Sequence, residues 1–434
     1  MIVERGRGRD IIIRGRNKNK ERYEKTISGY WPYAFVSDED AEHIEEAVKK
    51  ESGYKGLYGE DLTKITCATP YDVKQLSYYG TTWEANIPYV NRVLSDYIND
   101  GNEPIENYNH RTWYMDCEWS PTTNKMRVMV VYDSFTKKEY VWFVERSLAE
   151  QGLKDGQGKP YKEYGEYKYE TPAMGFATER DMLIHFLRHM KKQDPDIIAG
   201  WYVVGADIKQ IMERCRHNGL SELSLSPMRR VRYEFKDWSQ PIVGRNCIDL
   251  MLAVSKLWEL KNGKLPSYKL DDVAYEILGE QKIQLEKGHN ESWWEDKALY
   301  LHYARQDVRL LPKLDEAVNA LDYYTSLQHI VQCDLRSTPF ITKMFSQLVL
   351  TDPDFDRRIP TQPQFAKVDY EGADILDVKA GVYDNVGILD IKAMYHSNAD
   401  KYNISWDSLD PNGIDCGNGT KFSQDNKGLL VRQM

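Results

Sequence analysis

The chain of 434 residues is too long for one ordinary hydrophobic core, so we expect two to four domains. A hydrophobic fraction of 41%, with 12% aromatic residues, is typical of a folded chain and excludes wholesale disorder. No apolar stretch reaches the roughly 18 residues that a membrane-spanning helix needs. The basic N-terminus also lacks the apolar segment of a secretory signal. We therefore expect a cytoplasmic protein without a membrane partner.

Charge and cysteine content exclude fewer classes of function than length and hydrophobic content do. The net charge of −9 does not by itself indicate nucleic-acid binding. It does not exclude it either, because metal-binding carboxylates lower the isoelectric point of a nuclease whose phosphate groove is basic. The six cysteines are scattered, without a C-x-x-C pair, which favours reduced thiols over a disulfide or zinc framework.

The first hundred residues predict a mixed domain. Residues 1–22 are rich in Arg, Lys and Gly. We prefer a frayed or strand-forming terminus with a solvated charge run over an electrostatic arm for single-stranded nucleic acid. Residues 37–53 predict a helix, with Ser37 or Asp38 as its cap, Ile44 and Val48 on one face and Gly53 as its end.

From residue 111 onward the pattern indicates a mixed sheet covered by helices. The runs "TWYMDCEW", "KMRVMVVYD" and "KKEYVWFVE" predict an antiparallel meander. A polar loop is expected at 151–172, then a helix in "ERDMLIHFLRHMKKQDPD", a buried strand in "DIIAGW" and a helix in "DIKQIMERCRHNG". A long helical region at about 296–350 precedes a final β segment, 386–390. The fold class is therefore α/β in the broad sense, an α+β multidomain chain.

Asp116 and Glu118 lie two residues apart on a predicted strand, so both point to the same face. Two neighbouring carboxylates on an apolar strand are costly unless a cation joins them, and Mg²⁺ or Mn²⁺ prefers such oxygen ligands. A solvent-facing pair is the commoner explanation for an isolated D-x-E.

Two further sites favour a metal site over a solvent-facing pair. Asp207 lies where a strand gives way to a helix, a position that helix capping alone would also explain. Tyr303 and Asp307 are four residues apart and share one helix face. Together the four carboxylates can hold two metal ions roughly 3.5–4 Å apart, with Tyr303 orienting a water nucleophile.

Two aromatic and histidine patterns are weaker signals. Trp113, Trp119 and Trp201 are candidates for stacking on unpaired bases, but we expect at least half of them to be core residues. His185 and His189 have an i, i+4 spacing that zinc can use; without a third ligand we prefer a solvated helix face.

Three of these stretches resemble the exonuclease motifs of the family B DNA polymerases, with their patterns D-x-E, N-x-x-x-F-D and Y-x-x-x-D. They are "DCE" at 116–118, "AGWYVVGAD" at 199–207 and "YARQD" at 303–307. The similarity extends over about residues 105–430. It implies an RNase H-like 3′→5′ proofreading exonuclease with two Mg²⁺ or Mn²⁺ ions, in which Asp116, Glu118, Asp207, Tyr303 and Asp307 are the catalytic residues and the four carboxylates bind the metals.

The resemblance also implies a domain order: an N-terminal domain at 1–107, the exonuclease domain at 108–330, a helical linker at 331–369 that returns to the N-terminal domain, and the start of the polymerase palm at 370–434. Asp390 resembles the metal-binding aspartate of polymerase motif A, and Tyr395 the tyrosine beneath the incoming nucleotide. Tyr370, Gly372 and Arg245 are the implied DNA contacts.

By the same resemblance the sequence lacks the fingers, the second metal-binding motif and the thumb, so we expect no polymerisation by this chain alone. It would be one subunit of a split DNA-directed DNA polymerase (a nucleotidyltransferase of DNA replication) or an N-terminal fragment. The implied partners are single-stranded 3′ ends, primer–template DNA, a second polymerase polypeptide, a sliding clamp and, once completed, dNTPs.

Departures from the family pattern leave alternatives open. Tyr202 and Ala206 replace the family's Asn and Phe, and Ala393 and His396 replace its Ser and Pro. We interpret this as a divergent, viral lineage, in an infected host cell or, failing that, in a bacterial or archaeal cell. The alternatives to the exonuclease module are an assembly or DNA-binding subunit whose exonuclease is impaired, and a free-standing nuclease.

Overall fold

The computed structural model describes residues 2–103, 105, 109–153, 155–353, 355–361, 377 and 379–433. Its contacts divide the chain into two compact units. The first unit comprises Met1–Gly6, Ile11–Ile27 and Glu103–Met344, and the second comprises Arg7–Asp10, Ser28–Asn102 and Phe345–Met434.

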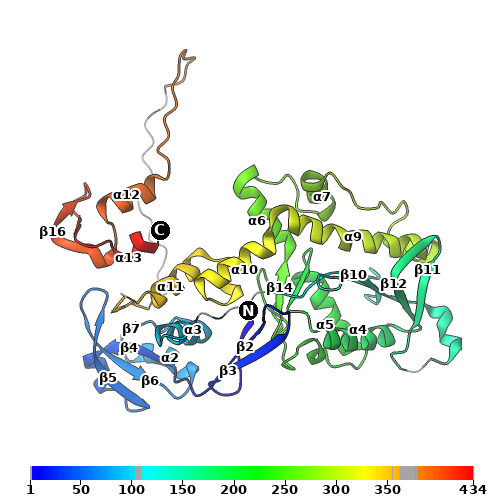
Figure 1. Cartoon of the computed structure of the whole chain (residues 1–434), viewed down its shortest axis with the longest axis horizontal. Coiled ribbons are helices and arrows are strands. Elements are labelled where there is room, and N and C mark those ends of the chain that lie inside the picture. Colours follow the sequence, from blue (N-terminus) through cyan, green and yellow to red (C-terminus); the bar gives the residue numbers. More distant parts are fainter. Residues whose placement is uncertain are drawn as a thin grey trace. The chain divides into compact units, whose positions relative to one another are not determined.

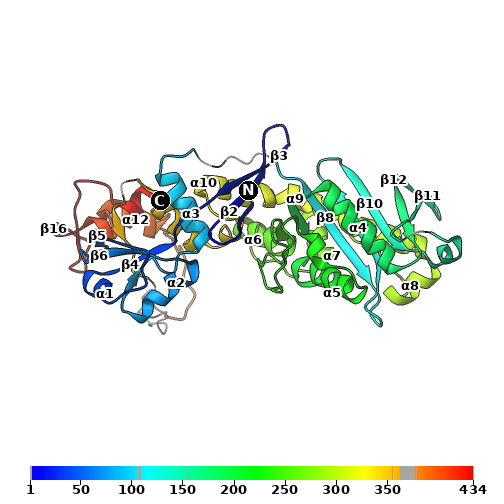
Figure 2. The same ribbon diagram turned by 90° about the horizontal axis from the view of Figure 1, so that it is seen from below.

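The first unit is built on a seven-stranded mixed sheet in the order β11-β12-β10-β9-β8-β13-β14. Its strands are β8 (Thr112–Trp119), β9 (Met126–Asp133), β10 (Lys138–Val144), β11 (Lys159–Tyr164), β12 (Tyr167–Phe176), β13 (Ile197–Gly200) and β14 (Asn246–Asp249). The β8–β9–β10 meander is antiparallel, whereas β13 is parallel to both β8 and β14. Figure 2 shows β8, β10 and β12 of this sheet. The predicted meander and mixed sheet are thus confirmed; the likeness to RNase H stays a prediction.

The expected loop at 151–172 is wrong in its second half, which forms the hairpin β11–β12. Polar residues on the outer face of this hairpin mask the alternating pattern that would predict its strands. On the inner face Tyr161 and Tyr164 pack against Phe143, with ring centroids 5.6 and 5.1 Å away. Cross-strand aromatic packing therefore outweighs the loop-like composition.

Helices cover both faces of this sheet (Figure 1). One face carries α6 (Leu250–Asn262), α7 (Leu270–Leu278), α8 (His289–Glu295), α9 (Lys297–Val318) and α10 (Ala320–Val331). The other carries α4 (Glu179–Gln193) and α5 (Lys209–His217), the latter continuing from one π-helical turn, η3 (Val204–Ile208). Short 3-10 turns lie at Arg146–Gln151, Glu222–Leu225 and Leu335–Ser337.

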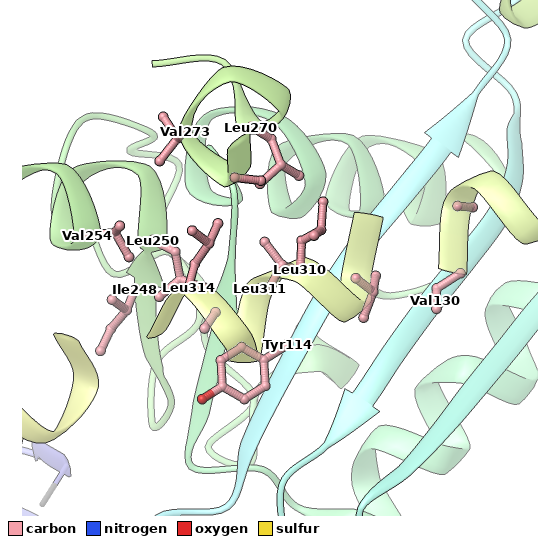
Figure 3. Close-up of a cluster of buried hydrophobic side chains, with 14 of the residues drawn as sticks. Tyr114, Val130, Ile248, Leu250, Val254, Leu270, Val273, Leu310, Leu311 and Leu314 are labelled. Carbon is pink, nitrogen blue, oxygen red and sulfur yellow. The ribbon is translucent and has the colours of Figure 1, made fainter. Parts of the chain in front are cut away.

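The period of β8 sends alternate side chains into two different cores. Trp113, Met115 and Cys117 are buried among the side chains of α4 and α5. Tyr114 points the other way, into a cluster with Leu310, Leu311 and Leu314 of α9, as Figure 3 shows. Asp116 and Glu118 share the parity of Tyr114, so they point toward α9.

The N-terminal residues form β1 (Ile2–Arg5), β2 (Ile11–Arg16) and β3 (Arg22–Ile27), so the terminus is strand-forming and not frayed. The expected solvated charge run is wrong for Arg14 and Arg16, which are buried. These strands group with the first unit, in contrast to the expected domain of 1–107. The cause is a set of buried ion pairs. Arg16 Nε lies 2.5 Å from Asp196 Oδ2, and Arg14 and Arg22 both pair with Asp194, at 3.1 and 2.9 Å.

The second unit contains a five-stranded sheet, β15-β5-β6-β4-β7, and small helices. The strands are β4 (Tyr33–Ser37), β5 (Lys49–Gly56), β6 (Asp61–Thr66), β7 (Thr82–Trp83) and β15 (Arg357–Arg358), with α1 (Asp38–Glu42), α2 (Pro70–Gln75), α3 (Tyr89–Asn99) and α11 (Ile341–Thr351, whose first residues belong to the first unit). Later residues form α12 (Met394–Tyr402), β16 (Leu409–Asp415), β17 (Lys421–Phe422) and α13 (Leu429–Gln433), with 3-10 turns at Leu76–Tyr78 and Trp406–Ser408.

Two predicted elements of the second unit differ from the structure. The helix expected at 37–53 starts as predicted, with Ser37 Oγ accepting from the Asp40 amide at 3.0 Å, but it ends at Glu42 because Lys49–Gly56 pairs with β6. The β segment expected at 386–390 is wrong: these residues are irregular, with Leu389 fully exposed. No strand among the described residues lies beside them to supply the hydrogen bonds that a strand requires.

Within the described ranges, every helix is too short or too polar to cross a bilayer. All six cysteines are free, as expected.

Candidate metal centre

Three of the predicted carboxylates converge between β8 and α9. One ligand oxygen from each of Asp116, Glu118 and Asp307 lies within 4.8 Å of the others. The first two project from alternate positions of β8 and the third from the inner face of α9, which packs across that strand. The convergence follows from the strand period of two, which puts Asp116 and Glu118 on one face of β8, and from the packing of α9 against that strand. It is the one such group among the described residues.

Asp207 lies close to this group without being part of the tight triad. It is buried in the π-helical turn η3, and its Oδ1 accepts from the Cys117 amide at 2.8 Å. That hydrogen bond fixes the carboxylate beside β8, between Asp116 and Glu118 in sequence. The capping alternative is not supported, because the cap positions of η3 and α5 are Val203 and Ile208.

The cluster concentrates negative charge where Asp307 is buried and Asp116 and Glu118 are partly buried. Burial, followed by the charges of Asp207 and Glu118, raises the pKa of Asp116 well above its usual range. Burial likewise raises the pKa of Asp207, and it raises the pKa of Asp307 to about 6 against the opposing charge of Lys282. Carboxyl groups with such values gain from a nearby cation.

The residues present fit a divalent cation. Asp307 Oδ2 pairs with Lys282 Nζ at 2.5 Å, but its Oδ1 is buried with no hydrogen-bond partner among the described residues. An unpartnered buried carboxylate oxygen is costly, and a metal ion satisfies it. A ligand group made up of carboxylate oxygens suits Mg²⁺ or Mn²⁺ rather than zinc.

Three residues of this centre were missed by the sequence analysis. Lys282 pairs with Asp307, His289 Nδ1 lies 3.5 Å from Glu118 Oε2, and the Tyr300 hydroxyl donates to the same oxygen at 3.2 Å. Lys282 lies in the segment between α7 and α8, whose composition carries no periodic signal, and His289 is the first residue of α8. The i, i+3 spacing of Tyr300 and Tyr303 on α9 was the one available clue.

Tyr303 is buried at the edge of the cluster. Burial and the charges of Glu118 and Asp307 raise the pKa of its hydroxyl, so it stays protonated at neutral pH. It lines a cleft of about 500 Å³ together with Asp116, Lys282, His289 and Trp201. A second hollow of about 550 Å³ opens on Glu118 and Trp119.

One of the three tryptophans is a core residue, which is fewer than the half or more that we expected. Trp113 is fully buried and donates its Nε1 hydrogen to Asp133 at 2.8 Å, so it is a core residue. Trp119 and Trp201 line the two hollows beside the carboxylates.

Tyr202, which replaces the family's Asn, adopts left-handed backbone geometry with φ of +59°. Its amide donates to Asp249 Oδ1 at 2.8 Å, and its ring is half exposed over Gly205, where an added Cβ would meet the ring at 2.4 Å. A bulky residue in this conformation costs about 1 kcal/mol or more, which is typical of constrained functional turns.

The remaining predicted site residues lie in other parts of the chain. Asp390 and Tyr395 belong to the second unit, and Tyr395 is 80% exposed. Tyr370 and Gly372 lie outside the described residues. Arg245 is 2% exposed and gives its hydrogen bonds to Asp194 Oδ1 at 2.8 Å and to backbone carbonyls, which argues against the predicted DNA contact.

His185 and His189 form an aromatic contact surface instead of the solvated face that we preferred. His185 Nδ1 accepts from Trp142 Nε1 at 2.8 Å, and the His189 ring stacks on Trp113 at 5.7 Å. Burial lowers the pKa of His189 to about 4.

Comparison with known proteins identifies the region. Residues 120–273 match the family model described as "DNA polymerase family B, exonuclease domain". That stretch contains Asp207, begins just after Glu118 and ends before Tyr303. This part of the chain therefore belongs with the exonuclease domains of the family B DNA polymerases.

Several curated family B polymerases are similar to this chain. It is 28% identical over 258 residues to the DNA polymerase delta catalytic subunit of Candida albicans, covering 53% of this chain and 24% of that protein. It is 22% identical over 243 residues to the DNA-directed DNA polymerase of Enterobacteria phage T4, covering 54% and 27%. With DNA polymerase 2 of Aeropyrum pernix it shares 23% over 266 residues, covering 59% and 32%.

The chain thus spans about a quarter to a third of the length of these family B polymerases, in the region of their N-terminal and exonuclease domains. Because they come from organisms of very different kinds, the comparison does not bear on a viral origin, which stays a prediction.

Proposed function

We propose that the metal centre is the active site of a 3′→5′ exonuclease, which hydrolyses the terminal phosphodiester of a DNA strand. We propose further that the role of this activity is proofreading. Asp116, Glu118, Asp207 and Asp307 would hold two Mg²⁺ or Mn²⁺ ions. Two divalent ions in such a site activate water and stabilise the charge that develops during in-line displacement at phosphorus.

The chain's own residues would contribute position and charge. Tyr303, kept protonated by its surroundings, would hydrogen-bond the attacking water and orient it toward the phosphorus. Lys282, whose pKa the pair with Asp307 raises although burial lowers it, would hold Asp307 in place and add positive charge beside the phosphate. Trp119 and Trp201 offer stacking surfaces for the terminal bases in the flanking hollows.

A single observation carries the proposal: three carboxylates from two distant elements meet within 4.8 Å, with one buried oxygen left unpartnered. An ordinary protein core avoids this arrangement, because like charges in a low dielectric repel and each lone carboxylate is poorly solvated.

The test is degradation of a 5′-labelled single-stranded DNA with Mg²⁺. We expect a ladder that shortens from the 3′ end and releases nucleoside monophosphates. In Asp116→Ala/Glu118→Ala its rate should fall by about a thousandfold or more, because both ion sites lose ligands. Glu150→Ala/Glu163→Ala, which removes two exposed acids of the same unit, is the matched control. No ladder with either wild type or control would favour the alternative, a DNA-binding or assembly subunit with an impaired exonuclease.

The wider architecture is also a proposal. We propose that residues 370–434 correspond to the start of a polymerase palm, with Asp390 as a metal ligand and Tyr395 beneath the nucleotide. Polymerisation would need a second polypeptide or a longer chain. This rests on the sequence resemblance, and adding candidate partner chains to a primer-extension assay tests it.

A further inference from the structure

A third hollow of the first unit is lined by none of the four carboxylates. It has a volume of about 570 Å³, within the range of small-ligand sites. Its walls are the start of β9, the end of β10, the first turn of α4 and the helix α8. Hydroxyl groups line it (Ser120, Thr122, Thr123 and Thr178) alongside two tryptophans, Trp293 and Trp294. We call it the α8 pocket.

The α8 pocket carries an excess of positive charge. Six cations line it (Lys125, Arg127, Arg146, Arg180, Arg214 and Lys297), against a single acid, Glu179. That acid is fully engaged, since both its oxygens accept from Arg214, at 2.7 and 2.5 Å. Lys297 and Arg180 have carboxylate partners outside the pocket lining, Glu145 and Asp155. In the part of the chain that the structure describes, Lys125, Arg127 and Arg146 form no ion pair with a carboxylate.

Of these three cations, Arg127 gives the strongest evidence for an anion site. It is only 5% exposed, and its guanidinium donates to neutral acceptors: the His289 carbonyl at 3.2 Å and Asn290 Oδ1 at 2.5 Å. A buried cation without a counter-charge is costly, so the site favours an anion that enters from the pocket. A guanidinium also retains further N–H donors in the fork geometry that suits phosphate.

The aromatic side of the α8 pocket supplies a stacking surface. Trp294 is 56% exposed, and the Arg146 guanidinium lies 5.0 Å from its ring centroid. Trp293 beneath it is buried and has Lys297 4.9 Å from its ring. A large exposed indole beside a row of cations is the combination that binds a base and its phosphate together.

We propose that the α8 pocket binds a nucleotide unit, with its phosphate on Arg127, Arg146 and Lys125 and its base on Trp294. The unit is either a free nucleoside monophosphate or one nucleotide of a passing strand. The strand case rests on the proposed exonuclease function, because His289 links the pocket to the carboxylates: its carbonyl accepts from Arg127 and its ring approaches Glu118. The free nucleotide does not require that function.

The test is binding without metal, so that no hydrolysis intervenes. In EDTA, calorimetry with dAMP and with inorganic phosphate, and anisotropy of a labelled oligothymidylate, would compare the full-length wild type with Arg146→Ala/Trp294→Ala. Both altered residues are exposed, so the variant should fold, which its melting temperature checks. Lys191→Ala/Tyr275→Ala, which also removes one exposed cation and one exposed aromatic ring of this unit, is the matched control.

We expect the dissociation constant for dAMP, for the oligonucleotide or for both to rise at least about tenfold in Arg146→Ala/Trp294→Ala and to stay unchanged in the control. A rise for dAMP assigns a free nucleotide, and a rise for the oligonucleotide alone assigns a strand; either supports the proposal. Equal binding by all three proteins would overturn it, as would phosphate binding as tightly as dAMP. Failure of the exonuclease assay would leave these binding results intact, so the two proposals fail separately.

Discussion

Asp116 holds its carboxyl group among three others, and burial and these neighbours raise its pKa well above the usual range. In the absence of metal, this repulsion opposes folding. We therefore predict that Asp116→Asn increases the free energy of unfolding in EDTA by about 1–2 kcal/mol and removes most of the stabilisation that Mg²⁺ gives to wild type. Thermal unfolding with and without Mg²⁺ measures both effects, with Glu163→Gln as the control. A lower melting temperature in EDTA for Asp116→Asn would contradict the electrostatic argument.

His189 should make stability depend on pH. Its pKa is about 4 in the fold, because it is buried and close to His185, and about 6.5 in the unfolded chain. The unfolded chain therefore binds the extra proton first, and stability is lost as the pH falls from about 6.5 to about 4. After allowance for partial exposure, the loss is about 2 kcal/mol.

His189→Gln should reduce that loss, because glutamine does not titrate. Chemical denaturation at pH 7 and pH 4.5 measures the difference for wild type, His189→Gln and the exposed control His217→Gln. The same pH slope in His189→Gln as in wild type would show that other groups dominate.

The residues of the metal centre were only partly readable from sequence. Asp116, Glu118, Tyr303 and Asp307 follow from strand and helix periodicity, because each pair lies on one element. Lys282 and His289 could not be found this way, since Lys282 lies in an irregular segment, His289 is the first residue of α8, and their partners lie on other elements. Arg245 was misjudged for a similar reason: its partner Asp194 is 51 residues away in sequence.

At the scale of elements, buried ion pairs hold β2 in the first unit. Asp196 has 2% side-chain exposure; it pairs with Arg16 and Arg22 and accepts from the Arg111 amide at 2.8 Å. Removal of one partner from a buried pair leaves a poorly compensated charge. We predict that Arg16→Ala lowers the free energy of unfolding by about 3 kcal/mol.

The control for this pair is Arg7→Ala, an exposed arginine of the same basic run, whose effect should stay within about 0.5 kcal/mol. Urea denaturation followed by circular dichroism measures both. Equal effects of the two substitutions would mean that Asp196 is satisfied by Arg22 and the backbone alone.

Elements with a strong local period were predicted and those set by distant pairing were not. The meander β8–β10, α4, β13 and α5 agree with the sequence because alternation or a 3.6-residue period marks each one. The segment after Glu42 has a helical pattern, yet its backbone finds antiparallel partners in β6. Residues 386–390 show the reverse case, an apolar run that stays irregular, with no strand beside it among the residues that the structure describes.

At the scale of the whole molecule, the order of the three motifs carried more information than any one of them. A D-x-E pair, a junction aspartate and a Y-x-x-x-D helix are each common, but their order over about two hundred residues is specific. The structure brings Asp116, Glu118 and Asp307 together, as that order implies, with Asp207 alongside. Composition and net charge could not have indicated the acidic centre, because the positive charges of the α8 pocket offset its negative charges in the total.

The measurement that tests the central claim most directly is a titration with Mn²⁺, followed by the electron paramagnetic resonance signal of the free ion. We predict two bound ions per wild-type chain and in the Glu150→Ala/Glu163→Ala control, and weak or no binding in Asp116→Ala/Glu118→Ala. Undiminished binding by Asp116→Ala/Glu118→Ala, or no binding by wild type, would contradict a metal centre at these carboxylates.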